Sequence, residues 1–193
     1  PELIIKMFER LHINPVADSY VKEDQPDFNF GSANIIRTDA DSETNSYLRF
    51  DVPNLSLENI TTTLRVYAES AGNQGYILNN VADNSWNEKS TTYNNAPPIG
   101  NSIASIGPFA ANSWTEVDVT SAVTGEGLLS LALTSTSNTN TSYSSREGSH
   151  PPELLIEPME PVMNPCGELI QEAEEGNLSG YFELGSDSIA SNP

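Results

Sequence analysis

The stretches Ser46-Tyr-Leu-Arg-Phe-Asp-Val52 and Leu64-Arg-Val-Tyr-Ala-Glu69 decide the fold of this chain. In each stretch apolar residues alternate with charged or aromatic ones, which is the period of two that a half-buried β-strand requires. We therefore predict two strands, each with one apolar and one amphipathic face. Later stretches alternate in the same way. The residues predicted to be buried between two sheets are Leu48, Phe50, Val52, Leu64, Val66, Val117, Val119, Leu129, Leu131 and Leu133.

The composition favours the same structural class along the whole chain. Hydrophobic residues make up 37% of the 193 residues, and almost no run repeats them at helical spacing. Short alternating stretches separated by turn residues are typical of sandwiches built from antiparallel sheets. We predict an all-β fold, a two-sheet antiparallel β-sandwich.

The charge balance excludes several partners. The chain carries 8 Lys and Arg against 27 Asp and Glu, a net charge of −19, whereas nucleic-acid binding needs clustered cations. We expect no nucleic acid and no anionic membrane surface as partner, and without an apolar run of about 18 residues we expect no membrane insertion. Acidity is compatible with calcium as a structural cofactor. Asp18, Asp24 and Asp27 are the candidate metal ligands, although loop carboxylates are also common without an ion.

Catalytic signatures are missing from the sequence. There is no Gly-x-Ser-x-Gly motif, Walker loop or His-Glu-x-x-His motif, and the only histidines are His12 and His150. We expect that the protein is not an enzyme. The single cysteine, Cys166, allows no intrachain disulfide and has no neighbouring His or Cys as a metal partner, so we predict that it does no chemistry.

The chain divides into four parts. Residues 1–13 are interpreted as the closing strand of a preceding module or a linker, because Pro1-Glu-Leu-Ile-Ile is echoed at Pro152-Glu-Leu-Leu-Ile. We expect residues 14–157 to form the sandwich, the Pro-rich residues 158–167 to form a linker, and residues 168–193 to begin a second module. The chain starts without a charged and apolar leader, and we interpret it as a fragment of a longer protein.

A series of short motifs between residues 15 and 157 resembles a known family. The motifs, in chain order, are Ala17-Asp-Ser-Tyr-Val, Asn29-Phe-Gly-Ser, Leu48-Arg-Phe-Asp, Ser85-Trp-Asn-Glu, Thr92-Tyr-Asn-Asn, Pro97, Trp114-Thr-Glu-Val-Asp-Val-Thr, Ser144-Ser-Arg-Glu and Pro152-Glu-Leu. Their order resembles the DNRLRE domain, which is related to family 96 carbohydrate-binding modules. The resemblance implies a β-jelly-roll in secreted, multidomain proteins, often beside glycan-degrading enzymes. Some members of the family bind acidic polysaccharides such as alginate.

The C-terminal residues resemble a different module. The sequence from Leu169 to Gly180 is similar to the opening of family 6 and family 35 carbohydrate-binding modules, in which a Glu-Ala-Glu strand contributes carboxylates to a structural calcium. Glu172 and Glu174 match that strand. We interpret residues 168–193 as the truncated start of such a module.

Most of the few cations lie on predicted strands. We expect the best ligand-binding cluster to be Arg49 and Arg65, flanked by Tyr47 and Tyr67 on the same sheet face, where arginines pair with carboxylates and rings stack on a sugar. The other interpretation is a solvated face whose arginines form ion pairs. Further candidates are Lys22, Arg37, Trp86, Lys89, Tyr93 and Arg146. The two aromatic residues of this second set either stack on a sugar or plug the end of the sandwich.

These observations support two functions. The first is a non-catalytic carbohydrate-binding module of a secreted, multidomain glycan-processing protein, with a polysaccharide as its partner. An acidic, alginate-like polysaccharide is one candidate ligand. The second function is a structural or adhesive repeat without glycan specificity, which contacts neighbouring modules of the same chain or assembles with itself. Both functions lead us to expect a protein that is secreted or held at the cell surface.

Overall fold

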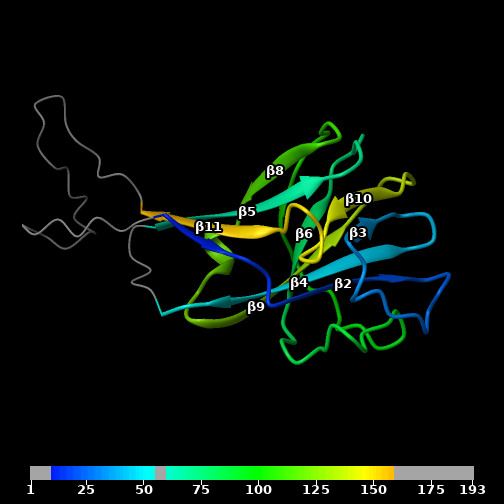
Figure 1. Ribbon diagram of the computed structural model, residues 1–193, viewed down its shortest axis with the longest axis horizontal. Coiled ribbons are helices and arrows are strands. Elements are labelled where there is room, and N and C mark those ends of the chain that lie inside the picture. The colour runs from blue at the N-terminus through cyan, green and yellow to red at the C-terminus, as the bar shows by residue number, and fades with distance from the viewer. Residues whose placement is uncertain (1–9, 55–59, 159–193) are drawn as a thin grey trace, which may run out of the picture. The chain divides into compact units, whose positions relative to one another are not determined.

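A computed structural model describes residues 10–54 and 60–158 of the chain (Figure 1). The described residues form eleven strands and one short 3-10 helix, η1. In chain order these are β1 (Leu11–Ile13), β2 (Ala17–Lys22), β3 (Ile35–Thr38), β4 (Thr44–Val52), β5 (Ile60–Ala68), β6 (Ile77–Val81), β7 (Ser102–Ser105), β8 (Ser113–Asp118), η1 (Thr120–Ala122), β9 (Gly127–Thr134), β10 (Thr141–Ser144) and β11 (Glu153–Pro158). The expectations for residues 1–9 and 159–193, including Cys166, Glu172 and Glu174, lie outside the described residues.

The strands form two antiparallel sheets that pack face to face (Figure 1). One, called here the β5 sheet, has the order β1-β11-β5-β10-β3, with β8 paired to β5. The other, the β4 sheet, has the order β2-β4-β9-β6-β7. All pairings between these strands are antiparallel. The predicted all-β, two-sheet antiparallel sandwich is therefore confirmed.

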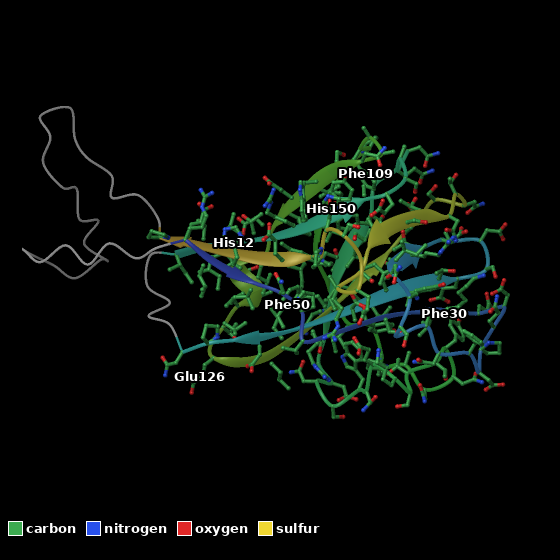
Figure 2. The ribbon with its side chains drawn as sticks, viewed as in Figure 1. His12, Phe30, Phe50, Phe109, Glu126 and His150 are labelled. Atoms are coloured by element: carbon green, nitrogen blue, oxygen red, sulfur yellow. The ribbon has the colours of Figure 1, made fainter. Side chains whose placement is uncertain are left out.

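The core between the sheets consists mostly of the residues that the alternation predicted. Nine of the ten are buried, and Phe50, which is fully buried, lies between the two sheets (Figure 2). The exception is Leu129, which is only partly buried, although it packs against the core. It stands near the beginning of β9, opposite Phe50, where the sheet ends and fewer strands can cover a side chain.

The two stretches that decide the fold lie in different sheets, which corrects one expectation. Strand β4 pairs with β2 and β9, whereas β5 pairs with β8, β10 and β11. Tyr47 and Arg49 therefore lie on the outer face of one sheet, and Arg65 and Tyr67 on the outer face of the other. Alternation determines which side chains of a strand point inward, but it does not determine which strands become neighbours. The predicted four-residue cluster on one sheet face does not exist.

The sandwich also begins earlier than the sequence suggested. Strand β1 pairs with β11, with Leu11 opposite Ile156 and Ile13 opposite Leu154. These residues were expected to belong to a preceding module or a linker. They complete the edge of the β5 sheet instead, because the apolar Leu11 and Ile13 pack against the same core as the rest of the sandwich.

The packing of the core predicts that two leucines of β9 contribute differently to the free energy of unfolding. Leu131→Ala should lower the free energy of unfolding by about 2–5 kcal/mol, because it leaves a cavity at a fully buried site. Leu129→Ala should cost less, about 1–2 kcal/mol, since part of that side chain is already in water. Denaturant unfolding of the two variants measures this difference, and equal losses would contradict the described packing.

Candidate functional site

A loop covers the outer face of the β4 sheet. This covering loop, residues 82–101, carries Trp86, which is 6% exposed and donates from Nε1 to the Ser130 hydroxyl at 3.0 Å. Tyr47 beneath it is 3% exposed and donates to the Pro97 carbonyl at 3.1 Å. These side chains form a second apolar cluster with Val21, Val81 and other residues. Tyr47 was expected to stack on a sugar, and Trp86 either to stack on a sugar or to plug the sandwich. Both rings are buried because the loop uses them for packing, which agrees with the plugging interpretation of Trp86.

Arg49 fastens the covering loop to the sheet. Its Nη1 donates to the Asn84 carbonyl at 3.0 Å and to the Trp86 carbonyl at 2.5 Å. The guanidinium carbon also lies 4.9 Å from the centre of the Trp86 ring, a cation–π distance. Arg49 is thus committed to contacts within the protein, and these contacts favour a structural role over the predicted role in ligand binding.

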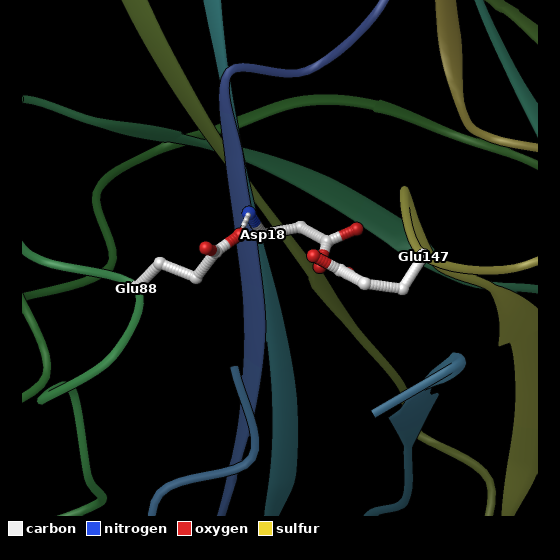
Figure 3. A group of neighbouring side chains, drawn as sticks. All are labelled: Asp18, Glu88 and Glu147. Carbon is white, nitrogen blue, oxygen red and sulfur yellow. Dashed lines mark hydrogen bonds between the residues drawn. The ribbon is translucent and has the colours of Figure 1, made fainter. Parts of the chain in front are cut away.

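Three carboxylates converge at one edge of the sandwich, as Figure 3 shows. Asp18 comes from β2, Glu88 from the covering loop and Glu147 from the segment after β10, and their oxygens lie within 4.8 Å of one another. Arg146 joins them. Its backbone N–H donates to Asp18 at 2.7 Å, and its Nε lies 3.2 Å from Glu88 and 2.9 Å from Glu147.

Burial is the main reason for the raised pKa of Asp18 in this acidic cluster. It raises the pKa of Asp18 from 3.8 to about 7, and the hydrogen bond from the Arg146 backbone opposes part of the rise. The negative charges of Glu147 and Glu88 raise the pKa further. The cations near the cluster are Arg146 and Lys89, whose Nζ lies 3.2 Å from Glu88. With Asp18 protonated, two carboxylates face two cations.

The residues predicted as a calcium site do not meet. Asp24 forms an ion pair with Lys22 at 3.1 Å, and Asp27 accepts a hydrogen bond from the Asn94 amide at 2.8 Å. Only Asp18 belongs to the acidic cluster. Carboxylate oxygens are the ligands that calcium prefers, but in this cluster a guanidinium already contacts two of the three carboxylates. As arranged, the cluster fits a positively charged side chain better than a calcium ion.

Aromatic side chains gather on the outer face of the β5 sheet. This aromatic cluster consists of Tyr67 on β5, Trp114 on β8 and His150 in the segment before β11. The rings of Tyr67 and His150 stack with centres 3.9 Å apart, and Trp114 meets Tyr67 edge to face at 5.4 Å. All three residues are half-buried, and His150 Nδ1 is buried without a hydrogen-bond partner. Figure 2 places His150 beside these strands.

Arg65 lies beside this aromatic cluster and is already neutralised. Its guanidinium carbon is 4.6 Å from the centre of the Trp114 ring. It forms ion pairs with Glu116, at 2.9 Å, and with Glu153. The interpretation of Arg65 as a member of structural ion pairs therefore has direct support, while its contact with a ligand stays a prediction.

The other candidate residues are spread over the sandwich. Arg37 donates to the Asn140 amide oxygen at 2.8 Å, and Tyr93 donates to Glu43 at 2.9 Å. Lys89 contacts the Gly31 carbonyl, while Lys22 is paired as described above. Lys22 and Arg37 both lie close to the Tyr20 side chain, whereas Tyr93 and Lys89 belong to the covering loop.

Sequence reasoning missed four residues that the structure brings into these clusters. Trp114 occupies an outward position of an alternating stretch, so its place on the surface was visible although its neighbours were not. Glu88 and Glu147 stand inside the motifs Ser85-Trp-Asn-Glu and Ser144-Ser-Arg-Glu. His150 had no signal, because its position depends on the path of the segment before β11.

A comparison with known protein families shows which family this chain is related to. A family model, carbohydrate-binding module family 96, matches residues 9–158. The chain belongs to this family. As a family 96 module it is a carbohydrate-binding module, a class that binds carbohydrate without catalysing a reaction on it. No curated protein that was compared matches the module. Within the described residues of the module no helix is long and apolar enough to span a membrane.

The Arg49 contacts predict a structural rather than a binding effect in this family 96 module. Arg49→Ala should lower the free energy of unfolding by about 2 kcal/mol or more, because two loop carbonyls lose a charged donor. Asp51→Ala, at the next outward and exposed position of β4, is the matched control and should change stability by less than about 0.5 kcal/mol. Chemical denaturation compares them, and an unchanged stability of Arg49→Ala would refute the anchoring role.

The ionisation of Asp18 predicts a pH dependence. Because its pKa is raised on folding, its contribution to stability is complete below about pH 3.8 and is lost as the pH rises to about 7. Asp18→Asn keeps the acceptor for the Arg146 N–H and removes the charge. The melting temperature of the variant relative to the parent should therefore increase between about pH 5 and pH 8, by a few degrees.

Melting curves of the parent and of Asp18→Asn, measured with and without calcium, test whether the acidic cluster binds this ion. We expect calcium to leave the melting temperature of the parent unchanged at the higher pH, because the guanidinium of Arg146 already contacts both Glu88 and Glu147. If calcium stabilises the parent and not Asp18→Asn, the acidic cluster is a calcium site after all.

Proposed function

We propose that this module binds a polysaccharide on the outer face of the β5 sheet, as a non-catalytic part of a secreted, multidomain glycan-processing protein. The observation that carries the proposal is the aromatic cluster of Tyr67, Trp114 and His150. The outer face of the β4 sheet is occupied by the covering loop, whereas these three residues on the other sheet are only half-buried. The location outside the cell is supported by the resemblance to modules of secreted proteins.

The chemistry of this face suits a sugar. The faces of pyranose rings carry apolar C–H groups that pack on aromatic side chains, and the sugar hydroxyls need hydrogen-bond partners beside them. Trp114 and Tyr67 supply the aromatic surface. Arg65, Glu116 and Glu153 supply donors and acceptors next to it.

A neutral polysaccharide fits this face better than an acidic one. The positive charge of Arg65 is shared by two carboxylates, and the net charge of −19 repels a polyuronate. An acidic, alginate-like ligand is the second candidate. It requires a uronate to displace Glu116, the more exposed of the two partners, from the Arg65 guanidinium.

Affinity gel electrophoresis tests the proposal with galactomannan or hydroxyethylcellulose as neutral ligands and alginate or pectate as acidic ones. Trp114→Ala should weaken retardation by a neutral polysaccharide about tenfold, because it removes the largest stacking surface. Tyr67→Ala should act in the same direction. Phe28→Ala is the control, since it removes an aromatic ring that is 57% exposed outside the aromatic cluster.

The outcomes separate the alternatives. Retardation that is lost in Trp114→Ala and kept in Phe28→Ala, with unchanged melting temperatures, supports binding at the aromatic cluster. Stronger retardation by the acidic polymers would replace the neutral ligand with an acidic one. If none of the polysaccharides retards the parent module, the glycan-binding proposal fails, and a structural or adhesive repeat becomes the better interpretation.

A further inference from the structure

A cleft opens between the edges of the two sheets, at a place that none of the predicted site residues occupies. It lies between strands β6 and β7 of the β4 sheet and the short helix η1, which follows β8. Its volume is about 440 Å³. The lining residues are Asn80, Ser102, Ile103, Ser121, Ala122 and Thr124. None of them belongs to the aromatic cluster.

The cleft exists because the sandwich is open at this edge. Successive side chains of a strand alternate between its faces, so Asn80 shares the inward face of β6 with Leu78. Leu78 is fully buried, whereas Asn80 is exposed and lines the cleft. The inward position of Asn80 is therefore not filled by the core. Ile103 and Ala122 are partly buried against the core and provide apolar surface within the cleft.

A bulge shapes the same edge. Strand β7 pairs with β6 through Ala104 opposite Leu78 and Ser102 opposite Asn79, which leaves Ile103 as the extra residue. Bulges bend a strand and change the direction of its side chains, and they are frequent next to binding sites. Here the bulge lies between Ser102 and Ala104 and places Ile103 at the cleft.

The polar groups of the cleft are uncharged and available. Of the six lining residues three carry a hydroxyl, one carries a carboxamide and none is ionisable. In the described part of the chain, the side chains of Asn80, Ser102, Ser121 and Thr124 form no hydrogen bond with the protein. Hydroxyl and amide groups around a small apolar surface are complementary to a ring that carries several hydroxyl groups.

We propose that this cleft is a second glycan subsite, which holds a single unit of a neutral carbohydrate such as a chain end. The inference rests on the proposed glycan-binding function. It adds a second binding place, the cleft, and names neutral carbohydrates as the ligand class of that place. A volume of about 440 Å³ is near the lower end of the usual range for ligand pockets, so the ligand is small. A uronate is excluded, because the cleft has no cation to pair with it and the protein is strongly negative.

Nuclear magnetic resonance titration of the full chain tests the subsite. The probes are neutral disaccharides (cellobiose, maltose, lactose and mannobiose), with a diuronate as the charged comparison. At least one neutral disaccharide should shift the amide signals of Asn80, Ser102, Ile103 and Ser121. The diuronate should leave these signals unchanged.

Variants of the lining residues locate the binding. Asn80→Ala should weaken the disaccharide about fivefold, as expected for the loss of one neutral hydrogen bond. Ser121→Trp should abolish binding by filling the cleft. Ser102→Ala should also weaken binding. Ser105→Ala is its matched control and should not, because both serines lie on β7 and only Ser102 lines the cleft. The spectra also show whether each variant is folded.

The outcomes distinguish this inference from the polysaccharide proposal. Shifts at the cleft that survive Trp114→Ala and disappear in Ser121→Trp support the subsite. Shifts confined to Tyr67, Trp114 and their neighbours overturn it and leave binding at the aromatic cluster intact. If no neutral disaccharide shifts the cleft signals while galactomannan still retards the protein, the subsite is refuted and the polysaccharide proposal stands.

Discussion

The contacts of Arg146 join the two sheets and the covering loop at one edge of the sandwich. Arg146 follows β10 of the β5 sheet, yet its backbone and guanidinium donate to Asp18 and Val16, at the beginning of the neighbouring sheet. The same guanidinium lies beside Glu88 of the covering loop. One side chain thus ties together both sheets and the loop. Carboxylates can be buried at this edge because each has a cation or a donor beside it, since an unpaired buried charge is very costly.

The attached loop makes the two outer faces of the sandwich unequal. Glu88 and Arg49 hold the loop at two points, and Trp86 between them fills the space above the β4 sheet. The aromatic residues of that face therefore contribute to stability. On the β5 sheet the segment before β11 contacts Tyr67 through the ring of His150, and Tyr67 and Trp114 are half-buried rather than buried. The asymmetry explains why aromatic residues of similar type have different roles on the two faces.

Much of the fold could be predicted from the sequence, and the reason is local. Alternation identified the inward residues of β4 and β5 correctly, because the direction of each side chain depends only on its own strand. The neighbours of a strand depend on the whole topology. For this reason the alternation wrongly predicts Arg49 and Arg65 on one sheet face, whereas the structure has them in different sheets. The site was less predictable still. The sequence around Trp86 is compatible both with stacking on a sugar and with packing inside the protein. Only the path of the covering loop, which brings Trp86 Nε1 to the Ser130 hydroxyl, distinguishes the two.

The pairing of β1 with β11 has a mechanical consequence. Leu11 is opposite Ile156, so the chain enters and leaves the sandwich at the same end of one short antiparallel ladder. Tension applied between residues 10 and 158 would load this ladder one hydrogen bond at a time, as a zipper opens, instead of shearing all of its bonds together. Such an attachment yields at low force. Under such tension β1 would therefore be the first strand to leave the β5 sheet, because it lies at the edge and pairs only with β11.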